Sequence, residues 1–337
     1  IITINFLFNF NYVLSTLSSF IYKFNTSTYF INQIFIASTH AYVNFITNEG
    51  RAYWVKIHEI PEASKNSRGA HIKGLLSLSP NEEITTVVTM EDFKEDTYLV
   101  MATANGIIKK TAVTELQNAK TRGILAIRLK DGDKLVSAIL TTGKDELLLI
   151  TRRGKALRYS EEKVRVMGRS SSGLKGIKLA TNDELVAALR IEKNSKMIII
   201  TESGYGKRVE FDNFAPHGRG TGGMKVYNIS EKSGEIVGAI TIADEDDIVC
   251  ITSQGKTLRL KSKKIPIRSR SAGGIHMFKI DSPDMVIGLD KIAKNNEEKE
   301  EVVEDDDTPM EFETDEGSSI SEEEDIVDDD AVEDEED

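Results

Sequence analysis

Short apolar runs and short polar stretches alternate along most of the chain. The runs at 147–150, 197–200 and 248–251 are each four residues long and are bounded by turn residues. Runs of this length and composition predict buried strands rather than helices. No long stretch shows the helical spacing of apolar residues, so the expected fold class is all-β.

The same order of elements returns about every 50 residues: an apolar run, a Thr-x-x-Gly turn, a basic strand, a glycine loop and a final apolar strand. The first glycines are Gly50, Gly106, Gly154, Gly204 and Gly255, and the second are Gly69, Gly123, Gly173, Gly223 and Gly274. The steps between first glycines are 56, 48, 50 and 51 residues, and the offsets within repeats are 19, 17, 19, 19 and 19. A fixed period of this size indicates an array of similar units.

Each repeat has room for about four strands, as in the blade of a propeller. A single blade cannot bury both of its faces, so neighbouring blades must share a core. The sequence therefore predicts a propeller-like ring in residues 34–293, with five visible blades.

The two ends of the chain lie outside this pattern. Residues 1–33 are apolar and rich in asparagine, with Lys23 as their single charge, and we interpret them as aberrant sequence without a structural assignment. They lack the basic start of a signal peptide, and Asn5, Asn9 and Asn11 disfavour a transmembrane helix. Residues 294–337 are acidic and of low complexity, so we expect a disordered tail.

Charge is distributed unevenly between the body and the tail. Residues 297–337 carry 24 acidic residues and one lysine, a net charge of −23, whereas residues 1–296 carry 42 basic and 31 acidic residues, a net charge of +11. This asymmetry suggests that the body binds a polyanion and that the tail competes with it. The single cysteine, Cys250, excludes an internal disulfide and a cysteine zinc site, and it favours a reducing, cytoplasmic location.

Basic residues recur at equivalent places of the repeats. On the strands they are Lys109, Lys110, Arg158, Lys207, Arg208 and Arg259, and around the glycine loops they are Arg122, Arg169, Lys175, Arg219, Lys225, Arg268 and Arg270. Equivalent positions of a ring lie at equivalent radii, so these side chains predict a basic belt suited to the phosphates of duplex DNA. The alternative is that each charge only solvates a surface strand. Aromatic residues are sparse, which argues against stacking on single strands.

Catalytic and metal-binding patterns are absent from the sequence. The G-x-G-x-x-G match at 218–223 is followed by a predicted strand, whereas a dinucleotide site needs a helix there. The five histidines are scattered without ligand spacing, and no nucleophile turn is found. We expect no catalytic residue, no metal site and no cofactor in this chain.

Four stretches carry a resemblance to a known family: TNEGRAYWVKIHEIPEAS (47–64), MATANGIIKKT (101–111), GKALRYSEEKVRVMGRSSSGLKGIKL (154–179) and TESGYGKRVEFDNF (201–214). They resemble successive blades of the C-terminal domain of bacterial DNA gyrase A. The resemblance implies a β-pinwheel that wraps duplex DNA non-specifically and presents it to the breakage-reunion domain of gyrase A. Gyrase B, its partner in the A2B2 enzyme, would supply ATP hydrolysis with Mg²⁺, and the acidic tail would regulate wrapping.

Two features depart from that family. It usually has six blades, and its first blade carries the box Gln-Arg-Arg-Gly-Gly-Lys-Gly, which is missing here; residues 218–225 come nearest. The missing box puts wrapping in doubt, and without the catalytic tyrosine and ATPase domains we expect no catalysis by this chain alone. Two alternatives stay open: the corresponding domain of topoisomerase IV, and a propeller that serves as a protein scaffold.

Overall fold

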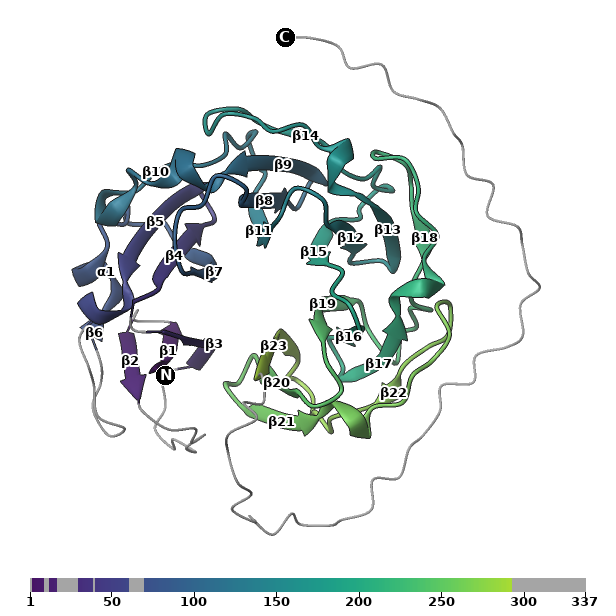
Figure 1. Cartoon of the computed structure of the whole chain (residues 1–337). Helices are drawn as coiled ribbons and strands as arrows, with labels where there is room; N and C mark the ends of the chain where they lie inside the picture. The colour runs from purple at the N-terminus through teal and green to yellow at the C-terminus, as the bar shows by residue number, and fades with distance from the viewer. Residues whose placement is uncertain (1, 9–11, 17–29, 39, 61–69, 293–337) are drawn as a thin grey trace.

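The computed structural model describes residues 2–8, 12–16, 30–38, 40–60 and 70–292. Six antiparallel sheets follow one another around a ring (Figure 1). We number these sheets as blades 1 to 6 in chain order. Within the described residues the only α-helix is the single turn α1 (Ile72–Leu75), so the prediction of an all-β, propeller-like fold is confirmed.

Blades 1 to 5 have four strands each, and blade 6 has three. In sheet order, blade 1 contains β3 (Phe30–Ala37), β1 (Ile2–Phe8), β2 (Tyr12–Thr16) and β6 (Ala70–His71), and blade 2 contains β10 (Ile124–Leu125), β5 (Arg51–Lys56), β4 (Tyr42–Thr47) and β7 (Ile84–Met90). Blade 3 contains β11 (Leu135–Thr141), β8 (Tyr98–Thr103), β9 (Ile107–Ala112) and β14 (Leu174–Lys175), and blade 4 contains β15 (Leu185–Arg190), β12 (Glu146–Thr151), β13 (Lys155–Ser160) and β18 (Met224–Lys225). Blade 5 contains β19 (Ile236–Ile242), β16 (Lys196–Thr201), β17 (Tyr205–Glu210) and β22 (Ile275–His276), and blade 6 contains β21 (Thr257–Lys261), β20 (Asp247–Thr252) and β23 (Val286–Ile292).

The blades do not correspond one to one with the sequence repeats. The short strands β6, β10, β14, β18 and β22 each belong to a sheet whose other strands come from the preceding repeat. They lie on the outer perimeter, whereas β7, β11, β15, β19 and β23 line the inside and contact one another in turn (Figure 1). Neighbouring blades are therefore joined by exchanged strands as well as by their shared core.

Blade 1 corrects the count of five blades. The sequence analysis left residues 1–33 without an assignment, yet β1 and β2 lie in this segment and form a sheet with β3 and β6. The ring then closes between blades 6 and 1, where β23 contacts β3. Repeat detection missed this blade because the segment contains no Thr-x-x-Gly turn.

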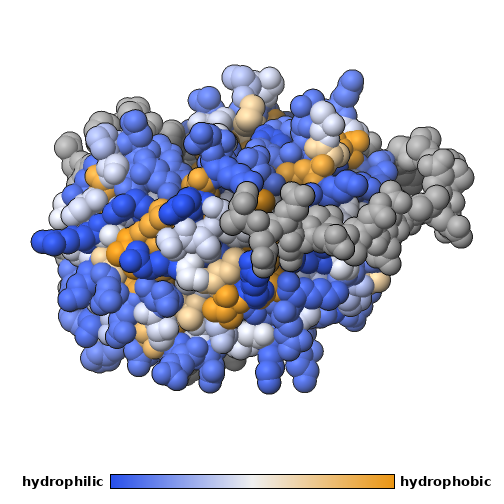
Figure 2. Space-filling model, turned by 90° about the horizontal axis from the view of Figure 1, so that it is seen from above, coloured by the Kyte–Doolittle hydropathy of each residue, from blue (hydrophilic) through white to orange (hydrophobic). Residues whose placement is uncertain are grey.

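The core lies between the blades. Successive residues of a strand point to opposite faces, and both faces of each central strand are covered. Leu148 and Ile150 of β12 pack toward blade 5 against Met197 and Ile199, whereas Leu147 and Leu149 pack toward blade 3. Seen from its edge, the ring is mostly hydrophilic, with hydrophobic residues showing between the polar ones (Figure 2).

The predicted turns are confirmed. In each Thr-x-x-Gly turn the glycine amide donates to the threonine carbonyl, as Gly154 does to Thr151 at 3.2 Å. Gly154 has a φ of +84°, which favours glycine, and an added Cβ would lie 2.8 Å from the Tyr227 carbonyl oxygen. The second glycine allows close approach too, because a Cβ on Gly223 would lie 2.6 Å from the Ala156 carbonyl oxygen of the neighbouring repeat.

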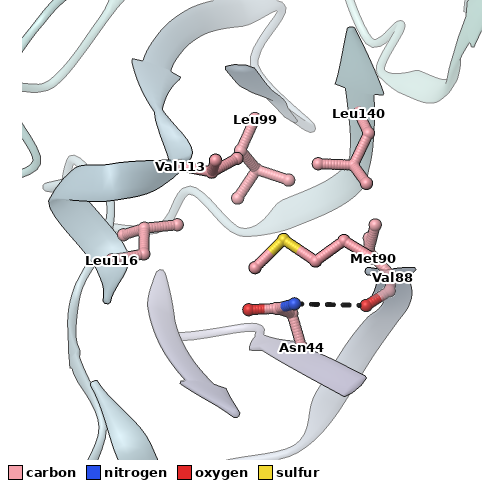
Figure 3. Close-up of a pocket in the computed structure, with 7 residues that line it drawn as sticks. All are labelled: Asn44, Val88, Met90, Leu99, Val113, Leu116 and Leu140. Carbon is pink, nitrogen blue, oxygen red and sulfur yellow. Dashed lines mark hydrogen bonds between the residues drawn. The ribbon is translucent and has the colours of Figure 1, made fainter. Parts of the chain in front are cut away.

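One buried polar residue interrupts the core between blades 2 and 3. Asn44 is 5% exposed and lines a small apolar cavity with Met90, Leu99, Leu116 and others (Figure 3). Its amide Nδ2 donates to the Val88 carbonyl oxygen at a long 3.4 Å. The equivalent residues of β8, β12, β16 and β20 are apolar: Val100, Leu148, Ile198 and Val249.

We expect Asn44→Val to raise the free energy of unfolding by about 1 kcal/mol, because valine removes a poorly bonded amide from an apolar site. Urea unfolding followed by circular dichroism measures this change. The matched control is Val100→Asn in the next blade, which should lower the free energy of unfolding by about 2 kcal/mol. A destabilised Asn44→Val protein would show that the amide contributes more than the packing of a valine.

Candidate nucleic-acid interface

Three equivalent loops project from the perimeter, and we call residues 166–175, 216–225 and 267–276 the rim loops. Each rim loop starts in a parallel bridge to a strand of the preceding blade, and the bridging pairs are Lys110 with Val166, Arg158 with Pro216 and Arg208 with Ile267. Each ends in the short strand β14, β18 or β22, which pairs with that same strand, β9, β13 or β17. Both ends of a rim loop are therefore anchored on one strand, and its middle faces outward.

Seven of the thirteen predicted DNA-binding residues lie at the surface of these loops or of their shorter counterpart, residues 120–125. Exposed side chains are those of Arg122, Arg169, Lys175 and Lys225, and partly exposed side chains are those of Arg219, Arg268 and Arg270. Solvent weakens the repulsion among them, and the set gives successive blades a common positive edge. The structure thus brings the loop half of the predicted belt together on the perimeter.

Arginines connect one rim loop to the next in a repeated way. Arg219 Nη1 donates to the carbonyl oxygen of Lys175 at 2.6 Å, and Arg270 Nη1 donates to the carbonyl oxygen of Lys225 at 3.0 Å. Arg219 Nε also donates to the Lys163 carbonyl oxygen at 3.2 Å. Each guanidinium is therefore held beside the lysine of the preceding blade, so that an anion at the junction would meet cations from two blades.

The strand half of the predicted belt has a different role, and two of its lysines are fully buried. Lys109 Nζ donates to the carbonyl oxygens of Ala126 and Arg169, both at 2.6 Å. Lys207 Nζ donates to those of Ser269, Arg270 and Ala272, at 3.0, 2.7 and 2.6 Å. Both ammonium groups support a basic loop from below and are covered by protein, so neither faces a phosphate on the surface.

Burial also changes the acidity of these two lysines. Desolvation lowers the pKa of Lys207 to about 7, and the charges of Arg268 and Arg270 act in the same direction. Desolvation lowers the pKa of Lys109 to about 8. The carbonyl oxygens oppose these shifts, because they accept hydrogen bonds from the charged ammonium.

The next position along each strand clamps two blades together. Lys110 Nζ donates to the Glu161 carbonyl oxygen at 3.0 Å, Arg158 Nη1 to that of Phe211 at 2.9 Å, and Arg208 Nε to that of Ile265 at 2.6 Å. Each acceptor lies at a 3-10 turn of the following blade: η4 (Glu161–Lys163), η5 (Phe211–Asn213) or η6 (Ser262–Lys264). These three residues therefore join blades, which corrects their assignment to a DNA-contacting belt.

A non-basic residue at the same position indicates this structural role. Trp54 of β5 donates from Nε1 to the Gln117 carbonyl oxygen at 3.0 Å, just after η2 (Val113–Leu116) of blade 3. A tryptophan N–H can replace a lysine or arginine as a donor to a carbonyl but not as a cation. The tryptophan in the first repeat was thus a signal that this position serves donation rather than charge.

Arg259, the last member of the strand set, lies on β21 of blade 6 and is exposed. Its guanidinium pairs with Asp247 of its own blade instead of with a following blade. Exposed cations that the sequence analysis did not include are Lys163 and Arg165, which lie just before a rim loop. Their position directly before the loop arginines could have identified them.

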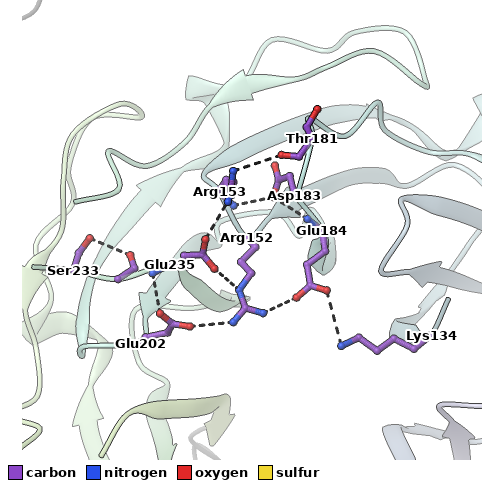
Figure 4. Close-up of polar contacts among 10 residues, drawn as sticks. Lys134, Arg152, Arg153, Thr181, Asp183, Glu184, Glu202, Ser233 and Glu235 are labelled. Carbon is purple, nitrogen blue, oxygen red and sulfur yellow. Dashed lines mark hydrogen bonds and ion pairs between the residues drawn. The ribbon is translucent and has the colours of Figure 1, made fainter. Parts of the chain in front are cut away.

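A separate ion-pair cluster joins blades 3, 4 and 5 on the side of the Thr-x-x-Gly turns (Figure 4). The Arg152 guanidinium contacts carboxylates of Glu184 at 2.5 Å, Glu235 at 2.6 Å and Glu202 at 3.0 Å. The hydrogen bond with Glu184 is the main reason that the pKa of Arg152 is raised. Acid and base balance here, and these arginine donors are occupied, so the cluster is structural and adds nothing to the basic edge.

The described residues contain no group of three or more His, Cys, Asp or Glu side chains that could hold a metal ion. Among the helices that the structure describes, none is long and apolar enough to cross a membrane. The predicted basic loops are therefore the main candidate site.

Comparison with protein families matches five segments of the chain to the family described as "DNA gyrase C-terminal domain, beta-propeller". The matched residues are 41–89, 97–142, 145–192, 195–243 and 246–293. These segments follow the five repeats that the glycines define and leave out blade 1.

Curated relatives that carry the name of the A protein of DNA gyrase match the same region. That of Treponema pallidum is 57% identical over 265 residues, which are 79% of this chain and 33% of that protein. That of Escherichia coli is 33% identical over 265 residues, which are 79% of this chain and 30% of that protein. The chain spans about a third of the length of these relatives.

Solved structures show the same fold. One of the DNA gyrase A C-terminal domain has a TM-score of 0.73 and 28% identity, and the match covers 87% of this chain and 99% of that one. The C-terminal domain of DNA topoisomerase IV also has a TM-score of 0.73, with 24% identity over 86% of this chain and 93% of that one. The fold alone therefore does not separate the two, whereas the curated relatives favour gyrase.

Proposed function

This chain belongs to the family of DNA gyrase C-terminal domains, and from that premise we propose that its rim loops bind and wrap duplex DNA. The observation that carries the proposal is the repeated placement of Lys175 beside Arg219 and of Lys225 beside Arg270 at successive blade junctions. A curved row of cations at regular intervals suits a bent duplex, because each neutralised phosphate releases counterions.

Recognition would be by backbone and shape. The described residues offer no helix that could enter the major groove, and the proposed contacts are made by side chains that bind phosphate. Binding should therefore depend strongly on salt and weakly on base sequence.

In the whole enzyme, the wrapped segment would be presented to the breakage-reunion domain of gyrase A, and negative supercoiling would draw on ATP hydrolysed with Mg²⁺ by gyrase B. This chain would itself need no cofactor and would act in the bacterial cytoplasm. The acidic residues 297–337 would compete with DNA for the rim, because their net charge of −23 opposes the basic body. These roles rest on the family and on the charge of the two segments.

The test is topological. Purified chain is mixed with nicked plasmid, the nick is ligated, the protein is removed, and the linking-number distribution is read. We expect a shift that grows with protein, and a salt dependence of log K with a slope of about −5 if about six phosphates are neutralised. Binding without a shift would mean that the rim holds DNA without wrapping it.

Variants give this experiment its resolution. The double charge reversal Lys175→Glu and Arg270→Glu should weaken binding similarly on all DNA sequences and flatten the slope by about 2 or more. Residues 1–296 should bind more tightly than 1–337 at low salt if the tail competes. This shortened chain starts at residue 1 so that β1 and β2 of blade 1 are kept. Absence of binding by both forms would contradict the proposal.

A further inference from the structure

Each rim loop starts with an apolar residue that points away from the core. Val166 is 50% exposed and Ile267 is 45% exposed, and Pro216 at the equivalent position is exposed as well. Single exposed apolar residues are common on protein surfaces. Here, however, the same position of three successive blades carries one, which is a property of the ring and not of one loop.

The backbone at this position is held firmly. The residue that follows each apolar one donates its amide to the preceding blade: Met167 to the Lys110 carbonyl oxygen at 2.8 Å, His217 to that of Arg158 at 2.8 Å, and Arg268 to that of Arg208 at 2.9 Å. The acceptors belong to the same three residues whose side chains clamp the next blade. Because the backbone is fixed, the three apolar side chains are presented without a further entropic cost of ordering the loop.

Cations surround these apolar side chains. Exposed Arg165 and Arg169 lie on either side of Val166 in sequence, Arg219 follows Pro216, and Arg268 and Arg270 follow Ile267. A protein partner would be expected to meet a contiguous apolar patch, whereas these residues are separated, one per blade. A small apolar tip between cations fits the minor groove of duplex DNA, where sugars and base edges lie between two rows of phosphates.

We infer that Val166, Pro216 and Ile267 enter the minor groove where it faces the ring and pack against its sugars, while the neighbouring arginines contact phosphates. This inference rests on the proposed function and adds a second kind of contact to it. DNA that is wrapped on a protein turns its minor groove inward once per helical turn, and side chains inserted there hold the curved path. On the rim, the three tips would determine the curvature of the wrapped DNA more than its affinity.

The test uses the full chain with Val166→Ser, Pro216→Ser and Ile267→Ser combined. The matched control is Met285→Ser with Ile287→Ser, because these residues are 45% and 51% exposed but lie at the start of the inner strand β23. We expect the triple variant to keep the salt slope of the unchanged protein and to lose roughly half or more of its linking-number shift. The control should keep both. A conservative second variant, Val166→Thr with Ile267→Thr, preserves side-chain shape and should lose a smaller part of the shift.

Netropsin, which occupies the minor groove, gives a second readout. It should reduce the shift produced by the unchanged protein on A·T-rich plasmid more than the remaining shift of the triple variant. An unchanged linking-number shift in the triple variant would overturn the inference and leave these residues for a protein partner. Loss of the salt slope together with the shift would also overturn it. Failure of the unchanged protein to bind DNA would instead contradict the proposed function.

Discussion

Replacing Arg208 by alanine is expected to lower the free energy of unfolding by about 2 to 4 kcal/mol. Arg208 is 8% exposed and donates from Nε to the Ile265 carbonyl oxygen and from Nη1 to Asp244, both at 2.6 Å. Alanine would remove the donor of a carbonyl at the junction of blades 5 and 6 and leave a cavity in its place. Urea unfolding followed by circular dichroism measures the loss.

The matched control for Arg208→Ala is Arg259→Ala. Arg259 is exposed and pairs with Asp247 within one blade, so its removal should cost less than about 1 kcal/mol. Equal losses for the two variants would show that Arg208 does not act as a clamp. DNA binding separates the two roles further, because a structural Arg208 should leave the salt slope unchanged in the folded variant, whereas a phosphate contact would flatten it by about 1.

The free energy of unfolding is expected to rise between pH 7 and pH 9, by on the order of 2 kcal/mol through Lys207. Burial lowers the pKa of Lys207 to about 7 in the folded chain, whereas an unfolded lysine has a pKa of about 10.4. Within this window the unfolded chain binds a proton that the folded chain has released, and stability rises with pH wherever that is so. Lys109, with its pKa lowered to about 8, contributes in the same direction.

The upper end of this window has its own cause. Burial raises the pKa of the Cys250 thiol, so above about pH 9 the unfolded chain loses its thiol proton first and stability falls again. Urea unfolding at pH 7, 8 and 9 measures the rise. The variant Lys207→Met should keep only the smaller rise that Lys109 causes. A rise of the same size in the variant would mean that the three carbonyl oxygens hold Lys207 protonated throughout.

The clamp and the buried lysines also show where reasoning from sequence stopped. A basic strand such as 107–112 normally places some charges in solvent, so Lys109 and Lys110 were both assigned to the DNA-binding belt. In the ring, blades cover both faces of this strand, and β14 with the start of a rim loop covers its outer edge. Neither ammonium therefore reaches the surface, although the sequence around them is no less polar than that of the exposed loops.

Loop cations were easier to predict than strand cations for a physical reason. Arg169 and Lys175 flank the glycine that the repeat locates, and a loop anchored at both ends has no second layer above it. Their surface position follows from local sequence, whereas their contact with DNA stays a prediction. The exchange of short strands could not be predicted, because β14, β18 and β22 are two residues long and carry no strand pattern of their own.

By itself, the sequence determined the repeat, the positions of the turns, the all-β class and the family, because glycine turns and strand periodicity are local properties of the chain. The tertiary structure alone decided three things: that a sixth blade forms from residues at the start of the chain, that neighbouring blades exchange strands, and which cations face solvent. Each of these depends on pairing between segments far apart in the chain. A lysine on a strand is a surface charge or a buried clamp only once the next blade has packed against it.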